Sequence, residues 1–258
     1  MLDTALITGA SSGIGRKIAL YHASQGGNLI LTARREDRLE ELKAQIEKNY
    51  SVKVHVIAAD IGKPEGPEKL IAAVDEAGLK VDILVNNAGY GGHGRLIDRE
   101  IKDEIAMIDL NVVALVKLTH EFAARMAKQG SGKILNVGST AGFVPGPTQA
   151  VYFATKAFVN SFSQAVDHEM RPHGVTCTVL APGYVETEFA KVANLEGTAM
   201  TKSGATPKDV AEIGYHAMMK GKLVAINEWG LSFFIQWVVP FLPRRMVMSM
   251  MERMQAKN

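Results

Sequence analysis

A tyrosine and a lysine, Tyr152 and Lys156, stand four residues apart in a segment whose apolar residues recur at helical spacing. Side chains four residues apart share one face of a helix. A tyrosine hydroxyl has a pKa of about 10, too high for a good base near neutral pH, and a nearby ammonium group lowers it. The pair therefore predicts an acid–base site, in which Tyr152 gives up a proton in one reaction direction and accepts one in the other.

A serine ends one of the predicted strands, at the sheet edge where ligands collect in open α/β folds. Ser139 precedes Tyr152 by 13 residues, and its hydroxyl can bond a carbonyl oxygen and stabilise charge that develops there. Each residue also has a purely structural interpretation: a tyrosine at a helix start, a solvated lysine and a capping serine. Their occurrence together favours catalysis.

Three glycines lie between the first predicted strand, residues 5–7, and an amphipathic helix. Glycine allows a tight turn and lets the backbone approach a pyrophosphate, and the helix N-terminus offers free N–H groups. A flexible turn is the alternative, but a dinucleotide site requires this position between strand and helix. The predicted cofactor-binding residues of this loop are Gly9, Ser11, Ser12, Gly13, Ile14 and Gly15.

Two arginines follow the second predicted strand, at the strand end that meets the adenosine ribose in dinucleotide folds. An acidic residue there binds the 2′-hydroxyl of NAD, whereas arginine suits the 2′-phosphate of NADP. Residues 31–35 contain Arg34 and Arg35 but no Asp or Glu. NADP(H) is therefore predicted in preference to NAD, against the alternative of two solvated arginines that start the next helix.

The elements that must position these residues are short apolar runs that alternate with helical patterns. This alternation predicts an α/β fold: a single Rossmann-type, doubly wound parallel sheet of about seven strands with helices on both faces. Residues 1–228 are expected to form one cofactor-binding and catalytic domain, followed by an apolar, Met-rich extension, residues 229–258. The predicted strands are residues 5–7, 29–31, 54–58, 83–85, 134–137, 175–180 and 223–226.

The order and spacing of these motifs resemble those of the short-chain dehydrogenase/reductase family, in its branch with chains of this length. The resemblance extends over roughly residues 3–230. Its motifs are Thr8-Gly9-x3-Gly13-x-Gly15, Asp60, Asn86-Asn87-Ala88-Gly89, Asn111, Ser139, Tyr152-x3-Lys156 and Pro182-Gly183.

The resemblance implies a role for each of four catalytic residues. Tyr152 would be the proton donor and acceptor, and Ser139 would orient the substrate carbonyl. Lys156 would bind the nicotinamide ribose and lower the pKa of Tyr152, and Asn111 would support a water relay behind the lysine. Nicotinamide would supply the hydride chemistry, while the protein supplies geometry and electrostatics.

The resemblance also implies cofactor contacts at the ends of three further strands. Asp60 would hold the adenine amino group beside Ile61, although an aspartate there can simply form a turn. Thr187 and the backbone of Val185 would contact the nicotinamide carboxamide, or Thr187 could only cap a helix. The remaining implied contacts are Asn87, Ala88, Gly89, Pro182 and Gly183, together with Tyr152 and Lys156.

Composition excludes several other classes of protein. The 29 basic and 27 acidic residues give a net charge of +2, too balanced for a nucleic-acid partner. The lone cysteine, Cys177, excludes an internal disulfide and is expected in the core. No histidine or cysteine pair has metal-ligand spacing, so no metal is predicted. We expect no secretory signal and no membrane span, and therefore a cytoplasmic protein.

The substrate is expected to be a hydrophobic carbonyl or alcohol, because residues 140–150 are largely apolar. Residues 189–205 are expected to form a mobile lid over it.

The C-terminal extension is expected to pack on the domain or on a neighbouring subunit. A peripheral membrane contact and a cover over a lipid-like substrate are the alternatives. The resemblance implies a homodimer or homotetramer. One alternative function is that of a 3-oxoacyl-thioester reductase. This assignment is weakened because Tyr90-Gly91 differs from the residues found at this place in the usual fatty-acid-synthesis ketoacyl reductases. The other alternative is a nucleotide-sensing protein on the same fold.

Overall fold

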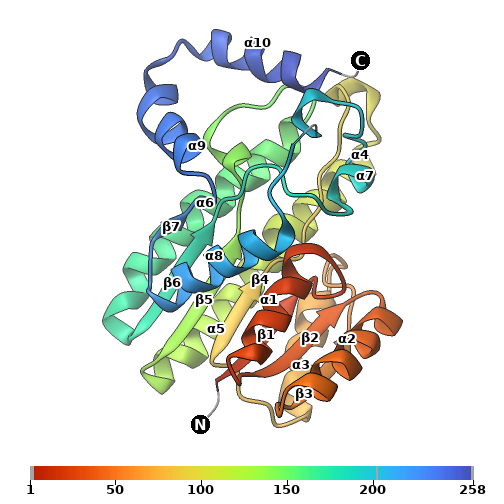
Figure 1. Cartoon of the computed structure of the whole chain (residues 1–258), viewed down its shortest axis with the longest axis vertical. Helices are drawn as coiled ribbons and strands as arrows, with labels where there is room; N and C mark the ends of the chain where they lie inside the picture. Colours follow the sequence, from red (N-terminus) through yellow and green to blue (C-terminus); the bar gives the residue numbers. More distant parts are fainter. Residues whose placement is uncertain (1–2, 202, 257–258) are drawn as a thin grey trace.

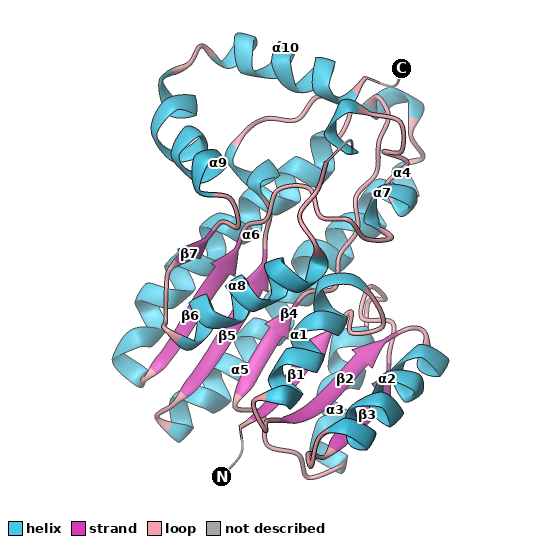
Figure 2. Ribbon diagram, viewed as in Figure 1, coloured by secondary structure: helices cyan, strands magenta, loops and turns pink. Residues whose placement is uncertain are grey.

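Seven parallel strands form one sheet, with the order β3-β2-β1-β4-β5-β6-β7. The computed structural model describes residues 3–201 and 203–256 of the chain, and all seven strands predicted from the sequence are confirmed there. The sheet crosses the molecule diagonally in Figure 2. Its strands are β1 (Thr4–Thr8), β2 (Asn28–Ala33), β3 (Val54–Ala58), β4 (Ile83–Asn86), β5 (Gly132–Val137), β6 (Val175–Leu180) and β7 (Val224–Ala225).

Helices cover both faces of the sheet, as the alternating pattern predicts. One face packs on α1 (Gly13–Ser24), α2 (Glu36–Asn49) and α8 (Pro207–Met219), which share one apolar cluster with the strands. The other face packs on α3 (Gly66–Glu76), α5 (Leu115–Gln129) and α6 (Ala150–Met170). Both clusters contain side chains with no exposed surface, such as Leu31 and Phe122. The rigid sheet therefore fixes the strand ends from which the candidate site is built.

The direction in which the strands are added reverses between β1 and β4, which lie side by side although β2 and β3 intervene in the sequence. In open α/β sheets, ligands bind at such a point, outside the carboxyl ends of the strands. The glycine loop follows β1, Asn87 follows β4 and Ser139 closely follows β5. The topology thus gathers the predicted motifs at one edge of the sheet.

The C-terminal segment arches over this edge, shown in blue in Figure 1. It comprises α9 (Trp229–Phe233), a π-helical turn (Phe234–Val238), a 3₁₀ turn (Val239–Phe241) and α10 (Arg244–Gln255). Gln255 holds the end of α10 in place: its side-chain oxygen accepts bonds from Gln149 Nε2 at 2.7 Å and Thr148 Oγ1 at 3.2 Å. No helix among residues 3–201 and 203–256 is both long and apolar enough to span a membrane.

Candidate active site

The glycine loop between β1 and α1 is tightly packed against the end of β4. Gly9 has φ +66°, and a Cβ there would lie 2.8 Å from Asn87 Nδ2; one on Gly15 would lie 2.4 Å from the same atom. Side chains at these two positions would push the loop off its support. The glycines therefore keep the backbone N–H groups at the start of α1 accessible to a pyrophosphate, and the loop fits the dinucleotide that the sequence predicts.

Polar bonds from the end of β4 hold the other side of this loop. Thr8 Oγ1 accepts from the backbone N–H groups of Asn87 at 2.9 Å and Ala88 at 3.0 Å. Asn87 Nδ2 donates to the carbonyls of Thr8 and Gly9, at 2.9 and 3.2 Å. Ala88 and Gly89 then follow along the same cavity wall, where the sequence predicts cofactor contacts. The two loops form one rigid cradle.

The two predicted phosphate-binding arginines occupy different surroundings. Arg35 Nη2 donates to Ser11 Oγ at 3.1 Å and to Ser12 Oγ at 3.0 Å. This arginine therefore connects the end of β2 to the glycine loop. Its Nη1 bonds Glu188, which the sequence analysis did not single out. Arg34 is exposed and also lines the cavity. Of the two arginines, Arg35 is therefore the one that is bonded to the glycine loop.

Asp60 and Ile61 follow β3 and line the cavity at its far end. Asp60 Oδ1 accepts from the backbone N–H of Gly62 at 3.2 Å, which is the turn-forming contact considered as its structural alternative. Ile61 is buried and packs into the core beneath. Both residues therefore have structural contacts of their own and also line the cavity in which the adenine ring is predicted to bind.

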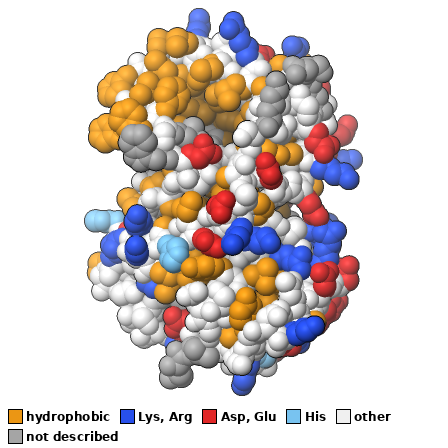
Figure 3. Space-filling model, in the orientation of Figure 1, with side chains coloured by type: hydrophobic (Ala, Val, Ile, Leu, Met, Phe, Trp, Pro, Cys, Tyr) orange, Lys and Arg blue, Asp and Glu red, His pale blue; other side chains and the backbone are white. Residues whose placement is uncertain are grey.

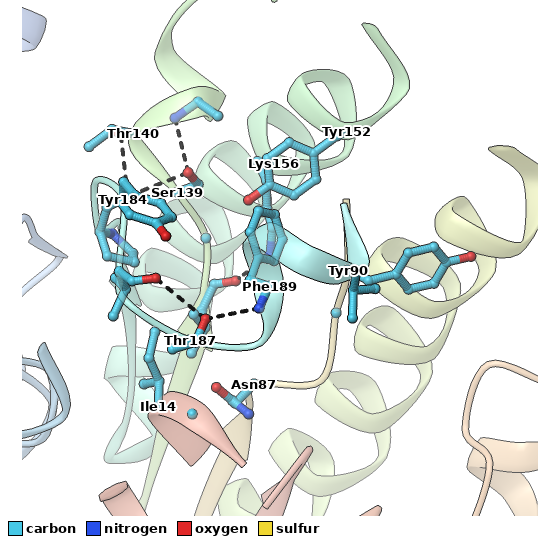
Figure 4. A pocket seen from close by; sticks show the side chains of 18 of the residues that line it. Ile14, Asn87, Tyr90, Ser139, Thr140, Tyr152, Lys156, Tyr184, Thr187 and Phe189 are labelled. Carbon is cyan, nitrogen blue, oxygen red and sulfur yellow. Dashed lines mark hydrogen bonds between the residues drawn. The ribbon is translucent and has the colours of Figure 1, made fainter. Parts of the chain in front are cut away.

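Tyr152 and Lys156 lie in the first two turns of α6, and both are buried. Lys156 Nζ donates to the Val137 carbonyl at the end of β5, at 2.8 Å, and lies 5.9 Å from the centroid of the Tyr152 ring. Figure 4 shows the two side chains side by side on the same helix. The spacing of four residues thus places the amine beside the phenol, on the helix face that meets the cavity.

The pKa of Tyr152 differs from the sequence-based expectation, and that of Lys156 is shifted as well. Burial raises the pKa of Tyr152 to about 12, although a hydrogen bond with Ser139 acts in the opposite direction. Burial lowers the pKa of Lys156 to about 8. The expected lowering of the tyrosine pKa by Lys156 is not found, because the removal of water outweighs the other effects on the phenolate. Near neutral pH Tyr152 is a protonated acid.

Ser139 lies after β5, next to Tyr152, where it precedes a 3₁₀ turn (Thr140–Phe143). Its Oγ accepts from the backbone N–H of Ala141 at 3.1 Å and donates to the Pro182 carbonyl at 3.4 Å. The capping contact considered as its structural alternative is therefore present, together with the bond to Tyr152. The serine and the tyrosine both line the cavity.

Asn111 lies behind Lys156, within a π-helical turn (Asp109–Ala114) that joins α4 (Ile101–Ile108) to α5. Its side chain accepts from the Tyr90 N–H at 3.1 Å and donates to the Tyr90 carbonyl at 2.9 Å and to Thr155 Oγ1 at 3.1 Å. Such π-turns often occur at functional sites. The side-chain bonds fix the loop that carries Gly89, next to Lys156 Nζ.

The loop after β6 closes the cavity from the opposite side. The Pro182 carbonyl accepts from Thr140 N at 2.9 Å, and Gly183 N donates to Asn227 Oδ1 at 3.0 Å. Val185 is buried and forms a single parallel bridge with Ala205. Thr187 Oγ1 accepts from Phe189 N at 3.2 Å, but the N-cap position of α7 (Phe189–Val192) is occupied by Glu188, so Thr187 is not the N-cap residue considered as its structural alternative.

Residues 189–205, expected to form a polar lid, contain a small apolar core of their own. Ala193 and Leu195 are buried beneath Tyr184, and Phe189 begins the short helix α7 (Phe189–Val192). The ring of Phe189 lies against that of Tyr152, with 5.3 Å between centroids and a tilt of 48°. Figure 4 shows Phe189 close to Tyr152. This contact between the two rings could not be predicted from the residue spacing.

One cavity of about 940 Å³ connects most of the glycine loop, the strand ends, Tyr152 and Lys156 with the C-terminal segment, whereas Gly15 and Asn111 do not line it. Its size is near the upper end of the range for ligand pockets. In Figure 3 orange side chains gather around a hollow in this part of the molecule. The wall beyond the cofactor end is largely apolar, with Gln149 and Glu228 among its polar residues. Its apolar side chains are those of Val144, Phe153, Phe189, Val192, Leu195, Met200, Phe234, Ile235, Val239, Val247, Met250, Met251 and Met254. Within the described part of the chain, no group of three potential metal ligands is found.

The fold and cavity define a nicotinamide-dependent oxidoreductase of the Rossmann type. The family model described as short chain dehydrogenase matches residues 3–197, so the chain belongs to that family, as the sequence motifs predicted. It is 37% identical over 235 residues to sulfoacetaldehyde reductase 2 of Chromohalobacter salexigens, covering 88% of this chain and 92% of that one. It is also 35% identical over 234 residues to serine 3-dehydrogenase of Agrobacterium fabrum, with the same coverage.

Solved structures agree with this assignment. A short-chain dehydrogenase from Sphingobium yanoikuyae in complex with NADPH matches with a TM-score of 0.83 and 30% identity, covering 94% of this chain and 97% of that one. A 7β-hydroxysteroid dehydrogenase matches with a TM-score of 0.87 and 27% identity over 97% and 96%. A short-chain dehydrogenase/reductase from Burkholderia phymatum in complex with NAD gives 0.82 and 25% over 91% and 92%.

Proposed function

We propose that this oxidoreductase uses NADP(H) to interconvert a carbonyl and an alcohol on a bulky apolar substrate. The observation that carries the proposal is the single cavity that joins the glycine loop and Arg35 to Tyr152 and continues under the methionines of α10. The cofactor, when bound, supplies or accepts the hydride. We also propose that residues 1–228 form the cofactor-binding and catalytic domain. The extension, residues 229–258, would cover the substrate end of the cavity.

The chain's own residues would divide the work at the reacting carbonyl. Tyr152, protonated near neutral pH, gives its proton to the carbonyl oxygen during reduction. Ser139 donates a hydrogen bond to the same oxygen and holds the charge that develops there. Lys156 binds the nicotinamide ribose, and Asn111 supports a proton relay behind it. In the oxidation direction Tyr152 takes the alcohol proton back.

The cofactor would lie along the cradle formed by the ends of the first four strands. The pyrophosphate and ribose would lie against the glycine loop, Asn87, Ala88 and Gly89. The adenine would be held by Asp60 and Ile61. Residues Pro182, Gly183, Val185 and Thr187 would face the carboxamide end. Arg35, bonded to Ser11 and Ser12, supports NADP(H) over NAD because guanidinium groups bind phosphate through paired, charge-assisted bonds.

An apolar substrate is supported by the cavity wall beyond Tyr152, where methionine and aromatic side chains predominate. Methionine adapts its shape to irregular apolar ligands. The 7β-hydroxysteroid dehydrogenase that resembles this fold acts, by its name, on a bulky apolar alcohol. The sulfoacetaldehyde and serine enzymes are named for small polar substrates, and their activities are the natural comparators in a test.

The test is a panel of carbonyl compounds scored by consumption of NADPH and, in parallel, NADH. The proposal expects turnover of bulky aryl or alicyclic ketones with NADPH, at a kcat/KM at least tenfold above that for sulfoacetaldehyde. A preference for sulfoacetaldehyde, for a 3-oxoacyl thioester or for NADH would contradict it. Binding of nucleotide without turnover of any compound would favour a nucleotide sensor.

We further propose that the protein is a cytoplasmic homodimer or homotetramer. Phe158 of α6 is 42% exposed and stacks on Phe162 at 5.5 Å, and Val113 is 39% exposed beside Asn111. These apolar side chains lie on the helices through which family members are expected to pair. Light scattering on the purified protein would show a mass two or four times that of the chain.

A further inference from the structure

A carboxylate of the substrate-side loop lies between two arginines of the cofactor side. Glu188 Oε2 accepts from Arg35 Nη1 at 3.0 Å, and its Oε1 accepts from Arg38 Nη1 at 2.7 Å. Glu188 is about 150 residues away from both in the sequence. The three side chains are between 40% and 48% exposed, so the contact lies at the rim of the cavity.

This rim is the end of the cavity at which a 2′-phosphate would bind. Arg35 follows β2 and also bonds the serines of the glycine loop, which is where the adenosine ribose lies in dinucleotide folds. A phosphate would need the same guanidinium N–H groups that Glu188 now accepts from. The hydrogen bonds from Arg38 and Arg35 hold the pKa of the Glu188 carboxyl below its usual value, so the competing group is an anion.

We propose that Glu188 is a specificity-determining residue whose carboxylate competes with the 2′-phosphate of NADP(H) for Arg35 and Arg38. The inference rests on the proposed use of NADP(H) and deepens it. NADP(H) exchanges one anion for another on the two arginines, whereas NAD(H) has no group that displaces the carboxylate. Because both ion pairs are partly exposed, they are weak enough for a phosphate to break.

Glu188 itself lines the cavity, in the segment between Thr187 and Phe189. The neighbouring Thr187 accepts a hydrogen bond from Phe189 N, and the ring of Phe189 lies against that of Tyr152.

The test uses two fragments that differ only by the phosphate in question, 2′,5′-ADP and 5′-AMP, with affinities measured by titration calorimetry. Glu188→Gln keeps the size of the side chain and removes its charge. We expect the variant to bind 2′,5′-ADP about 3- to 10-fold more tightly than the native protein, since exposed ion pairs have effects of this order. Its affinity for 5′-AMP should stay within about twofold.

Glu186→Gln is the matched control, because Glu186 is exposed in the same loop and, among the described residues, accepts no hydrogen bond from Arg35 or Arg38. It removes one negative charge without freeing an arginine, so neither affinity should change. A comparable gain in both variants would show a general charge effect and overturn the proposal. So would unchanged or weaker binding of 2′,5′-ADP to Glu188→Gln.

The same titrations separate this inference from the proposed cofactor. If the native protein binds 5′-AMP as tightly as 2′,5′-ADP, the choice of NADP(H) fails. A preference for 2′,5′-ADP that then emerges in Glu188→Gln would still support the competition. If neither protein distinguishes the fragments, both the cofactor choice and the competition are overturned.

Discussion

The two ends of the cavity are built in different ways. At the cofactor end, the chain is held by closely packed glycines and by hydrogen bonds to the backbone. For example, Asn87 Nδ2 donates to the carbonyls of Thr8 and Gly9. At the substrate end, flexible side chains such as Met250, Met251 and Met254 form the wall. A cofactor of fixed shape is suited to a rigid cradle, whereas a methionine surface can adapt to different apolar ligands. Catalysis is expected where the two meet, at Tyr152.

The largest effect is expected where the two ends meet. Tyr152→Phe removes the acid while it keeps the ring that packs on Phe189. Turnover should fall by about 10²- to 10⁴-fold, the usual contribution of general acid–base catalysis, with NADPH affinity nearly unchanged. Steady-state rates and a fluorescence titration measure the two quantities. The control is Tyr21→Phe, which removes a tyrosine hydroxyl on α1 that is hydrogen-bonded to His216. Retained turnover in Tyr152→Phe would rule out the acid role.

At the cofactor end, Arg35→Ala should weaken NADPH binding by about 10- to 100-fold, because bonds to charged groups are among the stronger ones in proteins. NADH affinity should change by less than about threefold. Lys17→Ala, an exposed cation on α1, controls for the loss of a positive charge. An equal loss for both cofactors would mean that Arg35 holds the loop through Ser11 and Ser12 and does not select the phosphate.

The pH dependence should report on Lys156. Since burial lowers its pKa to about 8, the side chain is charged below that pH and becomes neutral above it. We expect kcat/KM for reduction to decline above about pH 8, by at most about tenfold per pH unit, as the charge on the ribose-binding amine is lost. Lys156→Arg should move this decline upward by more than one pH unit, since arginine stays charged. A decline that remains near pH 8 in the variant would exclude the lysine as its source.

The smallest effect is expected at the substrate end. Gln255→Ala removes the oxygen that accepts from Thr148 and Gln149 and leaves two donors without it, which loosens α10 over the cavity. KM for a bulky ketone should rise by about three- to tenfold, because an unmade buried hydrogen bond is costly, while the Kd of NADPH stays constant. Glu252→Ala, exposed on the same helix, is the control. A changed NADPH affinity would show that the two ends are not independent.

The sequence predicted the cofactor end better than the substrate end, for a physical reason. A phosphate turn needs particular glycines at fixed spacing, and Tyr152 and Lys156 share a face because a helix has a fixed period. The contacts of Glu188 and Gln255 join segments more than 100 residues apart, and no local rule predicts such pairs. The raised pKa of Tyr152 was missed for a related reason, since the depth of burial depends on Phe189 and the other side chains above it.

The most direct test is a crystal structure of the protein with NADP⁺ and a bulky alcohol or ketone that it turns over. The account predicts the pyrophosphate on the glycine loop, the 2′-phosphate on Arg35, and the Tyr152 hydroxyl within about 3 Å of the substrate oxygen. The apolar part of the substrate should lie against Phe189 and Met251. A nucleotide bound elsewhere, or a Tyr152 hydroxyl directed away from the substrate oxygen, would contradict the account.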